Sequence, residues 1–253
     1  MEKNYYMWFL IFLSYSFLGW MMEVISKSYS YKKLVNRGFL FGPICPIYGF
    51  GAIFITIFLT EFRNYPVVVF LLGCILTGTI EYFTSYILEK IFNNKWWDYS
   101  TKKYNINGRV RLDFIALFGL FSCVVIYLGN DFFINLFSMM NYNSMKIISI
   151  ILLFMFIVDI IYSNIIAYNL RNRTIIAEEL KANKLAMIPG YIEKVLKGRV
   201  ENLKLYPTRL LDAFPYIKSR NEDIFNKMKK IRTKIKAKKS KSSKNKWFTF
   251  FIF

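Results

Sequence analysis

The stretch "VNRGFLFGPICPIYGFGA" (residues 35–52) is apolar enough for a membrane, yet four of its 18 residues are glycine and two are proline. Both residue types interrupt helices, since glycine loosens the backbone and proline lacks an N–H. Irregular backbone at membrane depth persists only where protein buries it or where it lines a water-filled cavity. The stretch therefore predicts a broken or re-entrant entry to a transmembrane helix; the alternative is a tight helix crossing with a proline kink. The residues concerned are Gly38, Gly42, Pro43, Pro46, Gly49 and Gly51.

The rest of the chain is also built for a membrane. Of its 253 residues, 55% are hydrophobic and 19% aromatic, and the apolar residues come in long runs rather than at amphipathic spacing. The sequence predicts an all-α fold, a polytopic membrane helix bundle of about five spans with a helical, basic cytoplasmic tail. The spans are 5–25, 39–59, 67–92, 113–129 and 147–166. Residues 130–146 are predicted to lie at the interface, with a sixth span as the alternative.

Charge orients these spans in a cell membrane. The loops 26–38 and 93–112 are rich in Lys and Arg, whereas 60–66 and 130–146 carry one basic residue each. Because basic loops stay in the cytoplasm, we expect the N-terminus outside and the tail inside. We divide the chain into a transmembrane domain, 1–166, and a basic cytoplasmic tail, 167–253.

The tail holds 22 of the 35 Lys and Arg residues and 7 of the 16 Asp and Glu residues, a net charge of +15. Amphipathic helical runs come first, and "KMKKIRTKIKAKKSKSSKNK" (residues 227–246) is too charged to bury, which predicts partial disorder. Such a segment binds anionic lipid headgroups, or it is a solvated tail that only fixes topology. A basic tail alone is poor evidence for nucleic-acid binding.

Ionisable residues inside spans are expensive and mark candidate sites. Glu23 lies near the end of the first span, and Glu81 lies well inside the third, on one helix face with Thr77, Ser85 and Glu89. Arg37 and Arg109 are the candidate partners, but Glu81 would need a cavity or a protonated state. These residues form either a structural ion-pair network or a site linked to a ligand or proton. The substrate-binding or coupling candidates are Glu23, Arg37, Glu81, Ser85, Glu89 and Arg109.

The loop 93–112 contributes to the same side of the membrane. Asn107-Gly108 is typical of a tight turn, and Arg109 directly follows it, placed to reach back over the bundle. An arginine there could hold a carboxylate or phosphate in two-point fashion. Trp96 and Trp97 are expected as anchors in the interfacial aromatic belt. Asp113 and Asp159 also lie in spans, without an assigned role.

Several chemistries find no support in the sequence. Histidine is absent, and Cys45, Cys74 and Cys123 are scattered without metal-ligand spacing. The sequence contains no G-x-x-x-x-G-K-[ST] phosphate-binding loop. We therefore assign no metal, no cofactor and no catalytic residue.

Four motifs together carry a family resemblance: "FLGWMMEVI", "VNRGFLFGPICPIYGFGA", "EYFTSYILEKIFNNKWWDYS" and "NINGRV". In this order, over about residues 8–130, the chain resembles the bacterial membrane family called putative ABC-transporter type IV (CmpB-like permease). The resemblance implies a transporter permease, whose ATPase would come from another chain, and five spans would then suggest a homodimer. Two other functions stay open: a membrane enzyme acting on a lipid or isoprenoid-like substrate at the cytoplasmic leaflet, and a membrane-anchored interaction protein whose tail is the working part.

Overall fold

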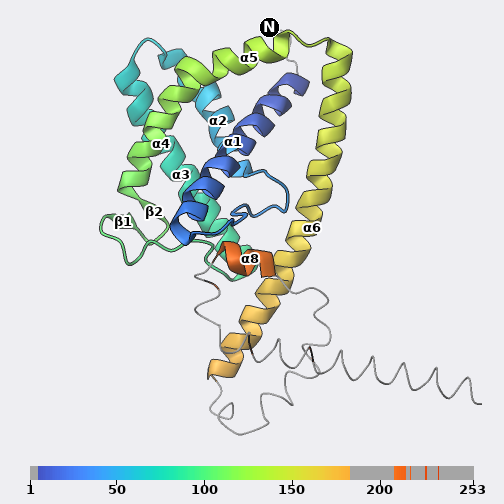
Figure 1. Cartoon of the computed structure of the whole chain (residues 1–253). Coiled ribbons are helices and arrows are strands. Elements are labelled where there is room, and N and C mark those ends of the chain that lie inside the picture. The colour runs from blue at the N-terminus through green and yellow to red at the C-terminus, as the bar shows by residue number, and fades with distance from the viewer. Residues whose placement is uncertain (1–4, 183–207, 215–216, 218–225, 227–232, 234–253) are drawn as a thin grey trace, which may run out of the picture.

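A computed structural model of the chain describes residues 5–182, 208–214, 217, 226 and 233. It consists of helices apart from one two-stranded hairpin in the 93–112 loop (Figure 1). The elements, in order, are α1 (Tyr5–Tyr31), α2 (Pro46–Leu59), η1 (Thr60–Phe62), α3 (Pro66–Phe92), β1 (Asn105–Ile106), β2 (Val110–Arg111), α4 (Leu112–Val124), η2 (Val125–Gly129), α5 (Asn130–Ser138), α6 (Tyr142–Ala182) and α8 (Thr208–Ala213).

The predicted all-α membrane bundle is confirmed. Four helical stretches are long and apolar enough to cross a membrane: Tyr5–Tyr31, Pro66–Phe92, Leu112–Ser138 and Tyr142–Ile176. The second predicted span contains a shorter apolar helix, Pro46–Phe62. Successive helices run in opposite directions, so the N-terminus and the end of α6 lie at opposite ends of the bundle (Figure 1). We call the end where α6 leaves the bundle, the lower end in Figure 1, the tail end.

The second helix begins later than predicted. The expected span was 39–59, but residues 32–45 form no helix and α2 starts at Pro46. Cys45 has extended backbone, with φ −116° and ψ 93°, as a residue before proline prefers. Pro46 itself stands in the first turn of α2, where its missing N–H is harmless. We call residues 32–45 the irregular segment.

The fourth span continues without a gap through a π-helical stretch, η2, into α5. The chain bends there, and α5 lies across the end of the bundle opposite the tail end (Figure 1). With nine residues, α5 is too short to cross a bilayer, so the described part of 130–146 forms no sixth span.

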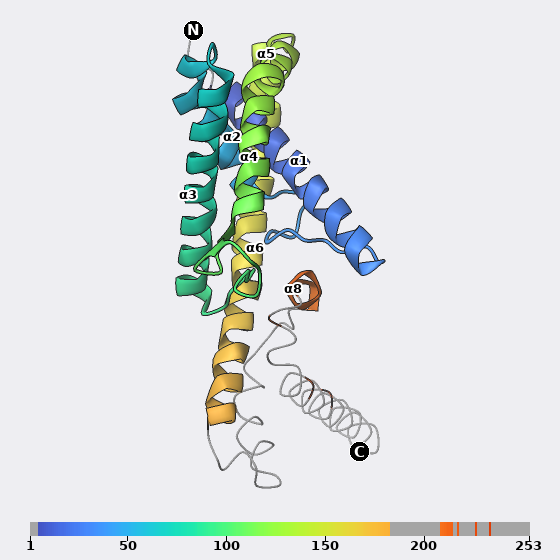
Figure 2. The same cartoon turned by 90° about the vertical axis from the view of Figure 1, so that its left-hand side faces the viewer.

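The fifth span belongs to a helix of 41 residues, α6. The boundary that the sequence places after residue 166 lies inside it. At the tail end, Leu170 of α6 is completely buried against Leu210 of α8 and its neighbours. Both views place α8 at this end, between α6 and the lower part of α1 (Figures 1 and 2). The described part of the tail therefore packs against the bundle, while the charged segment lies almost wholly outside the described residues.

The tail also changes the role of one tryptophan. Trp96 is only 3% exposed, and its ring packs against Phe214, with 4.8 Å between ring centroids. Phe39 and Phe92 complete its surroundings. The prediction of an interfacial anchor is wrong for Trp96, because residues just after α8 cover it.

Glycines let α1 and α2 approach closely. A Cβ at Gly49 would lie 2.2 Å from Oγ of Ser16 and 2.6 Å from the backbone oxygen of Phe12. A Cβ at Gly19 would lie 2.2 Å from the ring of Tyr48. In contrast, a Cβ at Gly51 would meet no atom within 4 Å. Gly49 and Gly51 both lie in regular helix, so the broken backbone is confined to residues 32–45.

We expect Gly49→Ala to lower the thermal stability of the purified protein. The added methyl group meets backbone that cannot rotate away, and such overpacking costs about 1–3 kcal/mol. Thermal unfolding in detergent measures the effect, and Gly51→Ala, two residues along the same helix, is the matched control. Equal melting temperatures for the two variants would contradict the close helix contact.

Candidate functional site

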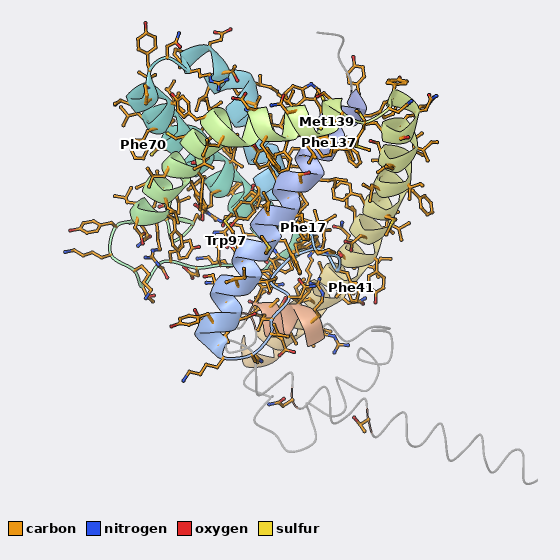
Figure 3. The ribbon with its side chains drawn as sticks, turned by 45° about the horizontal axis from the view of Figure 1, so that its top comes forward. Phe17, Phe41, Phe70, Trp97, Phe137 and Met139 are labelled. Carbon is orange, nitrogen blue, oxygen red and sulfur yellow. The ribbon has the colours of Figure 1, made fainter. Side chains whose placement is uncertain are left out.

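The irregular segment leaves α1 at the tail end, runs toward α6 and returns to the start of α2 (Figure 1). It lies beside the membrane-spanning part of α6, and Figure 3 shows Phe41 beside that helix. Its first two N–H groups bond to carbonyls of α1, but from residue 35 on the backbone has no helical pattern of hydrogen bonds, and Val35, Leu40 and Cys45 are buried. Each unsatisfied group in such surroundings would be costly, so the partners that they find define the site.

Asp159 of α6 satisfies the N–H groups at the centre of the segment. Its Oδ1 accepts from the backbone N of Phe41 at 2.8 Å, and its Oδ2 accepts from that of Gly42 at 2.9 Å. The Ser163 hydroxyl donates to Oδ1 at 3.0 Å and also lies 3.0 Å from the Phe41 nitrogen. A Cβ at Gly42 would lie 2.9 Å from Oδ2, so glycine permits this approach. The Asp159 side chain thus has a structural role, which is to accept hydrogen bonds from the backbone of the irregular segment.

Arg209 of α8 satisfies carbonyl groups of the same segment. Its two terminal nitrogens donate to the backbone oxygens of Gly38, at 2.8 Å, and Phe39, at 2.7 Å. Burial lowers the pKa of the Arg209 guanidinium, and the negative charge of Asp159 opposes that change. Since arginine keeps its proton in proteins, the segment lies between a permanent positive charge and the Asp159 side chain.

Asn36 stabilises the first half of the segment. Its Oδ1 accepts from the Trp20 indole N–H at 2.8 Å and lies 3.3 Å from the backbone N of Gly38. Its Nδ2 donates to the Phe41 backbone oxygen at 2.9 Å. At the far end, the Cys45 N–H donates to the Ser16 carbonyl at 3.0 Å. The segment is therefore held in one defined conformation by α1, α6 and α8.

Glu23 and Arg37 meet beside the segment, as their spacing in the topology suggested. Nε of Arg37 lies 3.7 Å from Oε2 of Glu23, and the Tyr48 hydroxyl donates to Oε1 at 3.0 Å. Arg37 also donates to the Ala213 carbonyl and lies over the Phe214 ring, 4.4 Å from its centroid. One loose ion pair thus joins α1, the segment and the residues at the end of α8.

Arg109 meets the lower part of the polar face of α3. One terminal nitrogen lies 2.6 Å from Oε2 of Glu89, a close ion pair without hydrogen-bond alignment, and the other donates to the Ser85 hydroxyl at 3.2 Å. Its guanidinium also lies over the rings of Tyr82 and Tyr86. These contacts occupy Arg109 within the protein.

The hairpin β1–β2 places Arg109 against the polar face of α3. Its strands pair Asn105 with Arg111, and the turn holds Asn107 and Gly108 at φ +52° and +69°. Nδ2 of Asn107 donates to the Tyr82 hydroxyl at 3.1 Å. The Trp97 indole N–H donates to the Arg109 carbonyl at 2.9 Å. The turn that the sequence predicts thus directs Arg109 back over α3.

Glu81 differs from the other two glutamates. It is 7% exposed, and its Oε2 is fully buried, with no hydrogen-bond partner among the described residues. Among the described residues, the charged group that acts electrostatically on it is another acid, Glu23. A buried carboxyl group with no donor needs a proton, a cation or a polar ligand, because an isolated carboxylate is costly to bury. Of the candidate residues, Glu81 is therefore the one whose carboxyl group remains available to bind a proton, a cation or a ligand.

A groove on the surface lies apart from these side chains. A shallow apolar groove opens between α1, α5 and α6, and Figure 3 shows Phe17 and Phe137 on the side of α1 and α5 that faces α6. None of the candidate residues lines it.

Among the described residues, no group of three or more Cys, Asp or Glu side chains could hold a metal ion.

Sequence reasoning found the acids and arginines but missed what shelters the segment. Asp159 carried a signal, since it is an acid inside a span. Arg209 carried none, because it lies 171 residues from the carbonyl of Gly38. Asn36 looked like an ordinary polar residue of a loop.

Comparisons with known proteins agree with the motifs. The family model described as putative ABC-transporter type IV matches residues 10–164, which confirms the family resemblance of the sequence. No curated protein and no solved structure matches the chain.

We expect Asp159→Ala to increase hydrogen exchange at the backbone amides of Phe41 and Gly42. The substitution leaves the Gly42 N–H without its acceptor, at a cost of about 1–3 kcal/mol, and leaves the Phe41 N–H with the Ser163 hydroxyl alone. Mass spectrometry of exchange in lipid nanodiscs follows the peptide that spans the irregular segment. Asp131→Ala is the control, because it removes an exposed ion pair with Arg63. Unchanged exchange in Asp159→Ala would refute the sheltering role.

Proposed function

Because the chain belongs to the putative ABC-transporter type IV family, we propose that it is the permease-like membrane component of a transport system. The sequence holds no phosphate-binding loop of the G-x-x-x-x-G-K-[ST] type, so the nucleotide-hydrolysing subunit would be a separate chain. This proposal places ligand recognition in the bundle and energy supply outside it.

Glu81 carries the proposal. It is a buried acid, one oxygen of which has no hydrogen-bond partner in the part of the chain that the structure describes, and its electrostatic neighbour Glu23 adjoins the irregular segment. Transporters build binding sites where helices are interrupted, because broken helices offer backbone polar groups at membrane depth. We assign Glu81 the ligand-contacting or coupling role, with Glu23 and Arg37 beside it.

The distribution of charge supports an orientation. The tail end carries the basic loops and the basic tail, whereas Arg63 and Lys146 are the basic residues of the loops at the opposite end. We propose that the tail end is cytoplasmic and the N-terminus outside. The basic tail would then lie where it can contact anionic headgroups and a cytoplasmic ATPase subunit.

A membrane enzyme acting on a lipid is the second candidate. Its favourable observation is Arg109, a guanidinium at the tail end of α3 that could hold a phosphate. However, Arg109 is already engaged by Glu89 and Ser85. A protein that served only as an anchor for its tail would have no use for a buried Glu81. The arrangement therefore favours a permease.

We expect Glu81→Gln to abolish the cellular effect of the protein without preventing its insertion. The amide keeps the shape of the side chain but cannot ionise or exchange a proton. Untargeted profiling of water-soluble metabolites and lipids compares cells without the protein and cells that express wild type, Glu81→Gln or Glu61→Gln. Glu61 lies in exposed η1 and provides the matched control.

A change in water-soluble metabolites that Glu61→Gln retains and Glu81→Gln loses supports the permease. A change confined to lipid species would favour the enzyme instead. A Glu81→Gln profile equal to wild type would contradict the assigned role of Glu81. Purification from native membranes without any co-purifying ATPase would contradict the dependence on a second chain.

A further inference from the structure

The short helix α8 and the irregular segment hold each other through reciprocal contacts. Arg209 of α8 donates to the carbonyls of Gly38 and Phe39 in the segment. In return, Arg37 of the segment donates to the carbonyl of Ala213, the last residue of α8. Each element thus supplies an arginine that satisfies backbone oxygens of the other.

Apolar side chains of α8 pack against the irregular segment and its neighbours. Leu210 and Ala213 are completely buried, and Phe214 is 5% exposed. This side of α8 belongs to one apolar cluster with Val35 of the segment and Trp96. Phe214 also lies under the Arg37 guanidinium, so the polar and apolar contacts meet at one residue.

From these contacts we infer that α8 is a latch, which closes the tail end of the bundle by holding the irregular segment in place and opens it by undocking. This regulation goes beyond the proposed permease function and does not depend on it. When α8 is docked, the Gly38 and Phe39 carbonyls are occupied and Arg37 is drawn toward Ala213. When α8 undocks, these groups become available together.

The size of α8 suits a part that docks and undocks as a unit. It has six residues, and helices this short are not stable in water without tertiary contacts. Its hydrogen bonds with the segment are three bonds from arginine, and Phe214 and Val35 belong to one apolar cluster. None of these contacts joins two transmembrane helices, so we expect undocking to leave the bundle intact.

Cys45 offers a native reporter of this change. It is the last residue of the irregular segment, is 9% exposed and interacts electrostatically with both Arg37 and Arg209. Opening of the latch lets water reach this thiol. The other two cysteines lie in the α3 and α4 spans, away from α8.

The test measures how fast a water-soluble maleimide labels Cys45 in lipid nanodiscs, in protein that carries Cys74→Ser and Cys123→Ser. We expect Arg209→Ala to label roughly tenfold faster than the parent, because charge-assisted hydrogen bonds to two carbonyls are lost. Phe214→Ala, which removes an aromatic ring from the apolar cluster, is also expected to increase the labelling rate. Arg111→Ala is the control, since Arg111 pairs with Asp113 away from α8.

A second reporter separates latch opening from general unfolding. Protein that keeps Cys74 but carries Cys45→Ser and Cys123→Ser receives the same Arg209→Ala change, and its labelling is expected to stay at the parent rate. Parental labelling of Cys45 in both Arg209→Ala and Phe214→Ala would overturn the proposal. Equal acceleration at Cys74 would also overturn it, because the whole bundle would then have loosened. Neither readout requires transport, so failure of the latch and failure of the permease proposal are distinguishable.

Discussion

The structure depends on one constraint: the backbone N–H and C=O groups of the irregular segment that lie within the bundle must find partners without a helix. A helix would satisfy them internally, but Pro43 and Pro46 would interrupt a helix that ran through the segment into α2. The partners come instead from three directions, namely Asp159 in α6, Arg209 in α8 and Asn36 within the segment. An acid inside a span and a tail folded back on the bundle are both consequences of this need.

The sequence revealed local features well and distant pairings poorly. Length and hydropathy predicted a helix in each of the five spans, although α2 begins later than expected and α5 was not predicted. The glycines and prolines of residues 35–52 predicted the interruption. Asn107-Gly108 predicted the turn that returns Arg109 to α3. The contact between Arg209 and Gly38 was beyond such reasoning, because the geometry of α6 decides where the chain returns. For the same reason Trp96 looked like an interfacial residue although Phe214 covers it.

The three glutamates of α1 and α3 show why an acid in a membrane span needs individual assessment. Glu23 has Arg37 and the Tyr48 hydroxyl, and Glu89 has Arg109. These two are explained by structure alone, since each acid has a donor or a cation. Glu81 lies on the same helix face as Glu89, two turns away, and its buried Oε2 has no donor within the described ranges. The structure thus separates Glu81 from Glu23 and Glu89, whereas the sequence placed the three acids in one set of candidates.

The continuity of α6 has a mechanical consequence. Asp159 and Leu170 are 11 residues apart, and at about 3.6 residues per turn they face nearly the same direction on the helix. Asp159 holds the irregular segment, and Leu170 packs in the apolar cluster that contains α8. Rotation of α6 about its own axis would therefore withdraw both contacts in the same movement. One continuous helix therefore links the support of the irregular segment to the docking site of α8.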